Sequence, residues 1–222
     1  SYFAYCVREQ YIHHNPAEKI RFQREPVTMI NTFTNEEVKR MVNYFSGSTF
    51  LEVRNKLIMI ILCDTGIRNY ELCNLKLNDI RETYINIMGK GKKVRHVPIT
   101  AVINKQLIKY MRARENYLKD KINYDKEFLL LSRTGRQLTI GTLENVVEAC
   151  GKACGIRMEI RISPHTCRHY YAQAQLKNGC DLFTVSRLLG HSNINITKRY
   201  LQSMQDQDIL EMGARTSPLM NL

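Results

Sequence analysis

The part of the sequence that decides the fold is residues 163–202, SPHTCRHYYAQAQLKNGCDLFTVSRLLGHSNINITKRYLQ. His165 and Arg168 lie three positions apart in it, and His191 and Tyr200 follow farther along. An arginine is always charged and its planar fork can hold two phosphate oxygens, whereas a histidine can change protonation near neutral pH. A tyrosine phenol can attack phosphorus and keep the product as a phosphotyrosine. This combination of side chains indicates chemistry on a phosphate ester.

The same stretch predicts how these side chains come together. Positions three apart on a helix are neighbours, so His165 and Arg168 are expected to share one face of a helix. A second helix is predicted over residues 181–189. A turn at Gly190 then directs His191 into the same cleft.

A second arginine is expected to reach this cleft from earlier in the chain. Residues 50–65 predict a helix that is apolar on nearly all sides and therefore buried. Gly66 ends this helix and allows a sharp turn, so that a rigid support directs Arg68 into the cleft. Glu71 is interpreted as an internal anchor at the start of a short helix. The alternative is that Arg68 is an ordinary surface residue.

A β-hairpin is predicted at residues 84–99, where two alternating segments flank a turn that is rich in glycine and lysine. The turn carries Lys90, Lys92 and Lys93. It is either a solvated loop or a finger that contacts phosphate, because the glycines around it permit a close approach of the backbone. Residues 128–131 predict a third strand.

Five motifs in this order resemble the tyrosine recombinase (phage integrase) family. They are TGIRNYEL at 65–72, GKG at 89–91, HTCRH at 165–169, LGH at 189–191 and Tyr200. The resemblance runs from about Phe33 to Tyr200, with one departure at Cys167, where the family usually has leucine. It implies a mixed α/β, mainly helical fold: an integrase-like catalytic domain with a small three-stranded antiparallel sheet.

The resemblance also implies the residues of the site. The expected catalytic residues are Arg68, Lys90, His165, Arg168, His191 and Tyr200. The residues expected to bind DNA are Lys92, Lys93, Arg95 and Arg133. The arginines and His191 would bind the non-bridging phosphate oxygens, His165 would assist the proton that leaves Tyr200, and Lys90 would protonate the departing 5′-hydroxyl. Glu71 is the structural support, and His169 is left as a structural or DNA-backbone residue.

Composition agrees with a polyanionic partner. The 222 residues carry 33 Lys and Arg against 21 Asp and Glu, a net charge of +12, and the pI is near 9.4. The electrostatic field of this net positive charge attracts phosphate groups. A basic surface that is merely solvated would give the same composition. The longest apolar run, 57–63, is too short to cross a bilayer. We therefore expect that the chain does not associate with membranes and that it lies in the cytoplasm. The seven cysteines are interpreted as reduced core thiols.

Three regions are predicted along the chain. Residues 1–24 resemble the last helix of a truncated core-binding domain, with a helical stripe that stops near Asn15-Pro16. Residues 25–33 are interpreted as a linker, and 34–222 as the catalytic domain with a C-terminal tail. The tail, residues 205–222, either folds back on its own domain or docks on a neighbour in a recombinase tetramer, and the second interpretation is favoured.

The function implied by the resemblance is site-specific recombination of double-stranded DNA through a 3′-phosphotyrosine intermediate and a Holliday junction, in the integration or excision of a mobile element. No metal or other cofactor is expected. The alternatives are a Xer-like resolvase, a type IB topoisomerase and a DNA-binding module without catalysis. A covalent product on one particular sequence would distinguish a recombinase from the last two.

Overall fold

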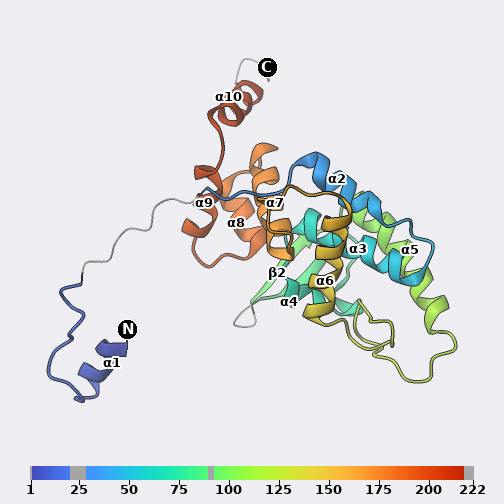
Figure 1. Cartoon of the computed structure of the whole chain (residues 1–222), viewed down its shortest axis with the longest axis horizontal. Coiled ribbons are helices and arrows are strands. Elements are labelled where there is room, and N and C mark those ends of the chain that lie inside the picture. The colour runs from blue at the N-terminus through green and yellow to red at the C-terminus, as the bar shows by residue number, and fades with distance from the viewer. Residues whose placement is uncertain (1, 21–28, 90–92, 218–222) are drawn as a thin grey trace.

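Helix α3 (Phe50–Thr65) lies at the centre of the fold, and helices α2, α5, α6 and α7 pack against it (Figure 1). The computed structural model describes residues 2–20, 29–89 and 93–217. Its other elements are α1 (Tyr2–Arg8), α2 (Asn35–Tyr44), α4 (Asn69–Cys73), the 3-10 helix η1 (Leu77–Asp79), β1 (Tyr84–Met88), β2 (Val94–Pro98), α5 (Ala101–Leu118), α6 (Ile140–Ala153), α7 (Pro164–Lys177), α8 (Leu182–Leu189), α9 (Asn195–Gln202) and α10 (Asp206–Arg215). The predicted fold class, mainly helical with a small antiparallel sheet, is confirmed.

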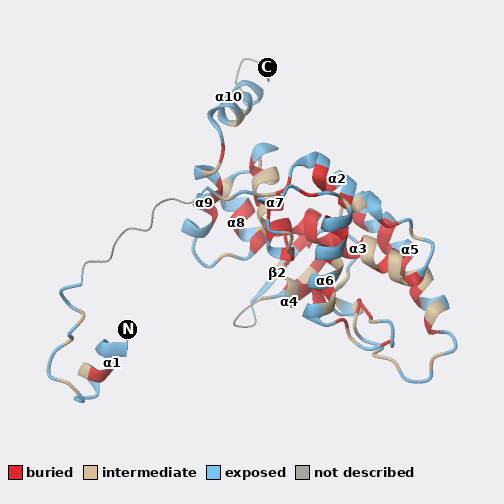
Figure 2. Cartoon of the chain, viewed as in Figure 1, coloured by how far each residue is buried: buried red, intermediate tan, exposed pale blue. Residues whose placement is uncertain are grey.

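Helix α3 is buried because its sequence offers no polar face. Leu57, Ile58, Ile61 and Leu62 are all fully buried, and Figure 2 shows most of the helix as buried. Burying one such side chain contributes about 1.5 to 3 kcal/mol relative to leaving it in water. The helix therefore forms a rigid support for the residues that follow it.

Gly66 ends α3 in the left-handed conformation, with φ of 59°, as predicted. A side chain at this position would not fit, because an added Cβ would lie 2.5 Å from Cδ1 of Tyr171 and 2.8 Å from Cδ2 of Leu189. Gly66 thus serves two purposes. It turns the chain toward Arg68, and it lets α7 and α8 approach the end of α3.

Threonine and serine side chains cap the starts of several helices. At α2 the Thr34 hydroxyl accepts the Glu37 backbone N–H at 3.2 Å, and the Glu37 carboxylate accepts the Thr34 N–H at 2.8 Å. The two reciprocal hydrogen bonds form a capping box. Thr100, Thr139 and Ser163 likewise accept a backbone N–H at the starts of α5, α6 and α7.

The predicted hairpin is present, but the predicted third strand is wrong. β1 and β2 pair antiparallel in a two-stranded sheet, with Ile85 opposite Val97. Residues 128–131 instead make isolated bridges, Lys76 with Phe128 and Leu131 with Gln137. Leucines 129 to 131 are fully buried, so their apolar run reflects burial in the core and not membership of a ladder.

The N-terminal helix is shorter than predicted. Helix α1 ends at Arg8, well before Asn15-Pro16, because Gln10 adopts a left-handed φ of 60° and the Tyr11 N–H returns to the Cys6 carbonyl at 2.8 Å. Figure 1 draws α1 apart from the other helices. Residues 21–28, which hold the predicted boundary at 24 and 25, lie outside the described residues, so the domain division stays a prediction.

The end of the predicted linker is bound to the domain. The Ile30 N–H donates to Oγ of Ser203 at 2.9 Å, and Nε2 of Gln173 donates to the Ile30 carbonyl at 2.8 Å. Oγ1 of Thr32 donates to the carbonyl of Thr166 at 3.0 Å. This segment therefore connects α7 with the residue that ends α9.

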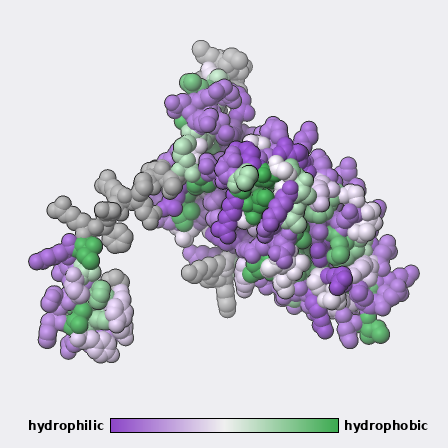
Figure 3. Space-filling model, viewed as in Figure 1, coloured by the Kyte–Doolittle hydropathy of each residue, from purple (hydrophilic) through white to green (hydrophobic). Residues whose placement is uncertain are grey.

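The tail contains helix α10, which contacts its own domain. Nζ of Lys177 on α7 lies 2.9 Å from Oδ1 of Asp208, and Met212 packs against the cluster formed by α7, α8 and α9. Ile209 and Leu210 remain exposed, and Figure 3 shows hydrophobic residues among hydrophilic ones on this protruding segment. Residues 218–222 of the tail lie outside the described part of the chain.

Candidate active site

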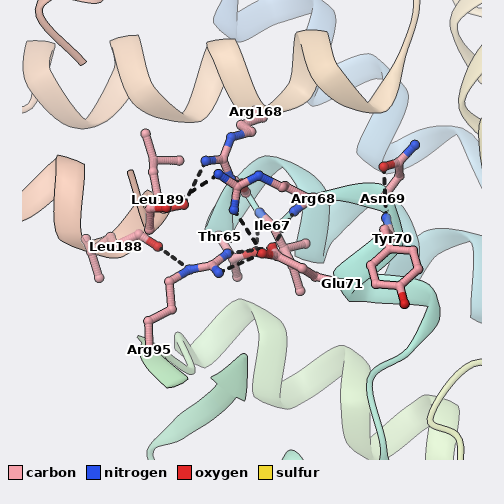
Figure 4. Close-up of polar contacts among 12 residues, drawn as sticks. Thr65, Ile67, Arg68, Asn69, Tyr70, Glu71, Arg95, Arg168, Leu188 and Leu189 are labelled. Atoms are coloured by element: carbon pink, nitrogen blue, oxygen red, sulfur yellow. Dashed lines mark hydrogen bonds and ion pairs between the residues drawn. The ribbon is translucent and has the colours of Figure 1, made fainter. Parts of the chain in front are cut away.

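The candidate site lies where α4, β2, α7 and the turns after α3 and α8 meet (Figure 4). Arg68 is the residue that precedes α4, and Arg168 comes from the first turns of α7. His191 follows Gly190, whose φ of 66° ends α8 as predicted. Tyr200 comes from α9. The structure thus brings together residues from both halves of the chain.

Glu71, the predicted structural support, contacts two arginines of the site. Its carboxylate accepts a hydrogen bond from Nη1 of Arg68 at 2.9 Å and two from Arg95, at 2.9 and 2.7 Å. Burial raises the pKa of Glu71, but the hydrogen bonds and charge of Arg95, followed by those of Arg68, outweigh it and leave the pKa below its usual value. A charged Glu71 therefore fixes Arg68 in place.

Arg95, one of the residues expected to bind DNA, lies against Glu71 inside the site. Its side chain is only 11% exposed. Besides binding Glu71, it donates from Nε to the carbonyl of Leu188 at 2.8 Å. A Cβ on Gly190 would lie 2.9 Å from Cδ of Arg95, so the glycine leaves room for this side chain. Arg95 connects the hairpin to the turn that carries His191.

Arg168 connects the two turns of the site. It donates from Nη1 to the carbonyl of Gly66 at 2.6 Å and from Nη2 to the carbonyl of Leu189 at 2.7 Å. Burial, followed by the charges of Arg68 and Arg95, lowers its pKa to about 10, so it remains charged at neutral pH. The guanidinium groups of Arg68 and Arg168 therefore line one pocket.

Tyr200 is almost wholly buried, at 3% exposure, and its hydroxyl lies 3.0 Å from Nδ1 of His169. Burial raises the pKa of Tyr200, while the charges of Arg168 and Arg68 act in the opposite direction. The ring of His191 lies nearly parallel to the phenol ring, with centroids 6.5 Å apart. The expected partner of the phenol was His165, so His169 is the residue that sequence reasoning missed.

The two histidines of the HTCRH motif face different neighbours. They are four positions apart on α7, and their rings touch edge to face with centroids 4.2 Å apart. His165 is exposed and lines a pocket of about 340 Å³ together with Arg68 and Arg168. Although the side chain is exposed, partial burial of its ring lowers the pKa of His165, and nearby arginine charges lower it further. The four-residue spacing was the available signal that both would point to one region.

His191 is held by a residue that the sequence did not single out. Its Nδ1 lies 2.7 Å from Oγ1 of Thr197, a fully buried residue of α9. Burial, and then the charges of Arg168, Arg68 and Arg95, lower the pKa of His191 to about 4. The imidazole is therefore neutral at pH 7, with its orientation fixed by Thr197.

The basic residues of the hairpin are only partly described. Lys90 and Lys92 lie outside the described residues. Lys93 is exposed, and its carbonyl accepts the Gly89 N–H at 2.8 Å, which closes the turn. Arg133 is exposed in the turn after Leu131.

Residues 31–207 match the model of the phage integrase family. The chain belongs to this family of tyrosine recombinases. It is 31% identical over 222 residues to tyrosine recombinase XerC of Thermodesulfovibrio yellowstonii. The matched region covers 99% of this chain and 73% of the relative. It is also 31% identical over 202 residues to tyrosine recombinase XerD of Listeria monocytogenes. Here the matched region covers 90% of this chain and 67% of the relative.

Solved structures agree with this assignment of the tyrosine recombinase fold. The XerA recombinase superposes with a TM-score of 0.73 at 30% identity, over 87% of this chain and 67% of that one. The XerH site-specific recombinase, bound to a palindromic difH substrate in a post-cleavage complex, gives 0.76 at 26% identity, over 98% of this chain and 64% of that one. Tyrosine recombinases cleave and rejoin DNA through a tyrosine nucleophile.

The described residues of this recombinase contain neither a membrane-spanning helix nor a cluster of metal-binding side chains. Within the described ranges, no helix combines the length and apolar character that crossing a membrane requires. The same residues contain no group of three or more His, Cys, Asp or Glu side chains suited to a metal ion.

Proposed function

We propose that Tyr200 is the nucleophile of a site-specific DNA recombinase and forms a 3′-phosphotyrosine bond with the cleaved strand. The observation that carries this proposal is the position of the phenol. It lies against His169 and is subject to the charges of Arg168 and Arg68, while those arginines line a pocket together with His165. A phenol that is subject to fixed cationic charges is an arrangement that favours phosphoryl transfer.

The transition state explains the choice of residues. An attacked phosphodiester passes through a crowded phosphorus centre with negative charge on its equatorial oxygens, so catalysis depends on positioned cations and hydrogen-bond donors. Arg68 and Arg168 bind the non-bridging oxygens, and His191 donates a further hydrogen bond to them. Lys90 protonates the departing 5′-hydroxyl.

Rejoining uses the same steps in reverse. A 5′-hydroxyl from another strand attacks the phosphotyrosine and releases Tyr200, so the energy of the broken phosphodiester is retained without ATP. Neither a metal ion nor another cofactor is needed for these steps. Exchange of both strand pairs in this way passes through a Holliday junction.

Assembly on DNA is the second part of the proposal. Four protomers bind double-stranded DNA, attracted by a net charge of +12. The tail, residues 205–222, contributes to the contact between protomers, with Ile209 and Leu210 as an exposed apolar pair. Residues 1–24 act as the end of a core-binding domain, joined through 25–33 to the catalytic domain.

The biological role proposed first is the integration or excision of a mobile element. Xer-like resolution is the second candidate, and the names of the XerC and XerD relatives at 31% identity favour it. A plasmid assay separates the two candidates once the DNA site is known from footprinting on the DNA that flanks the gene. Integration joins two different sites, whereas resolution acts between two copies of one site.

The experiment that tests the chemistry uses suicide substrates, which trap the cleaved strand. The expected result is a covalent complex on one particular sequence, which is lost in Tyr200→Phe while DNA binding remains. Relaxation of any supercoiled DNA would indicate a type IB topoisomerase instead. Band shifts without a covalent product would indicate a binding module.

A further inference from the structure

The side chain of His169 contacts the phenol that the proposed chemistry uses. Its Nδ1 lies 3.0 Å from Oη of Tyr200, and the two ring centroids are 5.5 Å apart. The contact joins α7 to α9, across 31 positions in the sequence. Because Tyr200 is 3% exposed, water has little access to this hydroxyl.

The protonation states decide the direction of this hydrogen bond. Burial lowers the pKa of His169 to about 4, with further effects from the charges of His165 and Arg168. Burial raises the pKa of Tyr200. At neutral pH the imidazole is therefore neutral and the phenol protonated, so a phenol O–H can donate to an unprotonated Nδ1. From outside α7 and α9, His191 also interacts electrostatically with His169.

His165 is less well placed for this proton. It is exposed and lines the pocket with Arg68 and Arg168, and its ring lies against the ring of His169, which in turn contacts the phenol. The arrangement thus separates two tasks. His165 faces the space where a phosphate would lie, and His169 faces the hydroxyl that would attack it.

We propose that His169 is the general base that accepts the proton of Tyr200 during strand cleavage, a catalytic residue in addition to those already considered. This inference rests on the proposed function, in which Tyr200 is the nucleophile. As the bond from Oη to phosphorus forms, the Oη–H bond breaks and its proton passes to Nδ1. The bond from phosphorus to the 5′ oxygen breaks at the same time, and that oxygen takes a proton from the general acid.

Rejoining reverses the step, because the same path must serve both directions. Protonated His169 returns its proton to Oη as the phenol leaves phosphorus, and a 5′-hydroxyl attacks. Bound DNA assists the forward step. The charge of Arg168 is one of the causes, after burial, that lower the pKa of His169. A phosphodiester next to Arg168 offsets that charge, so the imidazole becomes a stronger base when substrate is present.

The test compares two substitutions of His169 in the full chain. Asn places an amide near the position of Nδ1 and can keep the hydrogen bond to Tyr200, but it cannot accept a proton. Ala removes both functions. We expect His169→Asn and His169→Ala to slow formation of the covalent complex by about 10² to 10⁴-fold, with unchanged DNA binding and a flatter dependence of the rate on pH. His14→Asn, at an exposed histidine without a role, is the matched control.

Two outcomes would overturn this inference. If His169→Asn cleaves at the wild-type rate, His169 only positions the phenol. If both variants cleave faster, His169 restrains Tyr200. A covalent complex that persists in Tyr200→Phe would instead overturn the proposed function, whatever the His169 variants do.

A measurement without DNA tests the hydrogen bond itself. In the free protein, the ¹⁵N shift of His169 should report an unprotonated Nδ1 that accepts a hydrogen bond, and Tyr200→Phe should change that shift. A protonated Nδ1 in the wild-type chain would contradict the assigned direction.

Discussion

Glu71 and Arg95 form a two-pronged ion pair, with nitrogen to oxygen distances of 2.9 and 2.7 Å, inside a site where side-chain exposure is 5% and 11% respectively. The same carboxylate holds Arg68. One buried acid therefore fixes the position of a proposed catalytic arginine and of the hairpin that carries Lys90. Such pairs cost desolvation to form, but removing one partner leaves a buried charge without compensation.

Arg95→Ala should lower stability and cleavage without altering the electrostatics of DNA binding. Loss of the guanidinium leaves Glu71 partly unpaired, at a cost of about 3 kcal/mol in the free energy of unfolding. Since Arg95 is buried against Glu71 and Leu188, the salt dependence of DNA affinity should not change. The exposed Lys93 provides the contrast, because Lys93→Ala should reduce the salt slope by about 1. An equal fall in slope for Arg95→Ala would show that Arg95 contacts phosphate after all.

Glu71 should make part of the stability depend on pH. Its folded pKa lies below the ordinary value of 4.5, so its contribution is fully present above the unfolded pKa and is lost as pH falls through the folded pKa. Urea unfolding of wild type and Glu71→Gln should therefore differ by about 3 kcal/mol at pH 7 and by less at pH 3.5. A difference that is independent of pH would show that Glu71 is neutral in the folded chain.

Gly66→Ala should destabilise the chain and misplace Arg68. Alanine is strained at a φ of 59°, and its Cβ would meet Tyr171 at 2.5 Å. The combined cost is about 2 to 4 kcal/mol in urea unfolding. Gly141→Ala is the control, because that glycine lies in α6 with no atom within 4 Å of an added Cβ. Equal stability of the two variants would contradict the packing described for Gly66.

Lys90 can be tested by changing the acidity of the leaving group. A bridging 5′ sulfur departs without a proton, so a missing general acid should not matter on that substrate. Lys90→Ala should be slow on ordinary DNA and nearly normal on the sulfur substrate, whereas Lys92→Ala and Lys93→Ala should lose at most phosphate affinity. Rescue of Lys92→Ala or Lys93→Ala in place of Lys90→Ala would move the general acid along the hairpin.

Local features of this fold could be predicted from the sequence, and long-range partners could not. The turns at Gly66 and Gly190 depend on a few adjacent residues, and both occur as predicted. The destination of Arg95 depends on Glu71 and Leu188, which lie 24 and 93 positions away. A pattern of neighbouring residues does not predict partners so far away in the sequence.

The same limit explains the two other differences. Buried leucines at 129 to 131 look like a strand in the sequence, but a ladder also needs a partner of matching length, and here the partners form single bridges. The sequence around His169 shows only a helical histidine four positions after another histidine, and it does not indicate a contact with Tyr200. Its contact with Tyr200 arises only when α9 packs on α7.

The central claim is that Tyr200 is the residue that becomes joined to DNA, and peptide mapping of the trapped covalent complex tests it most directly. Digestion of the complex with nuclease and protease, followed by mass spectrometry, should place the phosphotyrosine on the peptide that contains Tyr200. Tyr170 and Tyr171 are the informative alternatives, because both lie on α7 beside His169. A phosphotyrosine at either of these positions, with Tyr200 unmodified, would contradict the account.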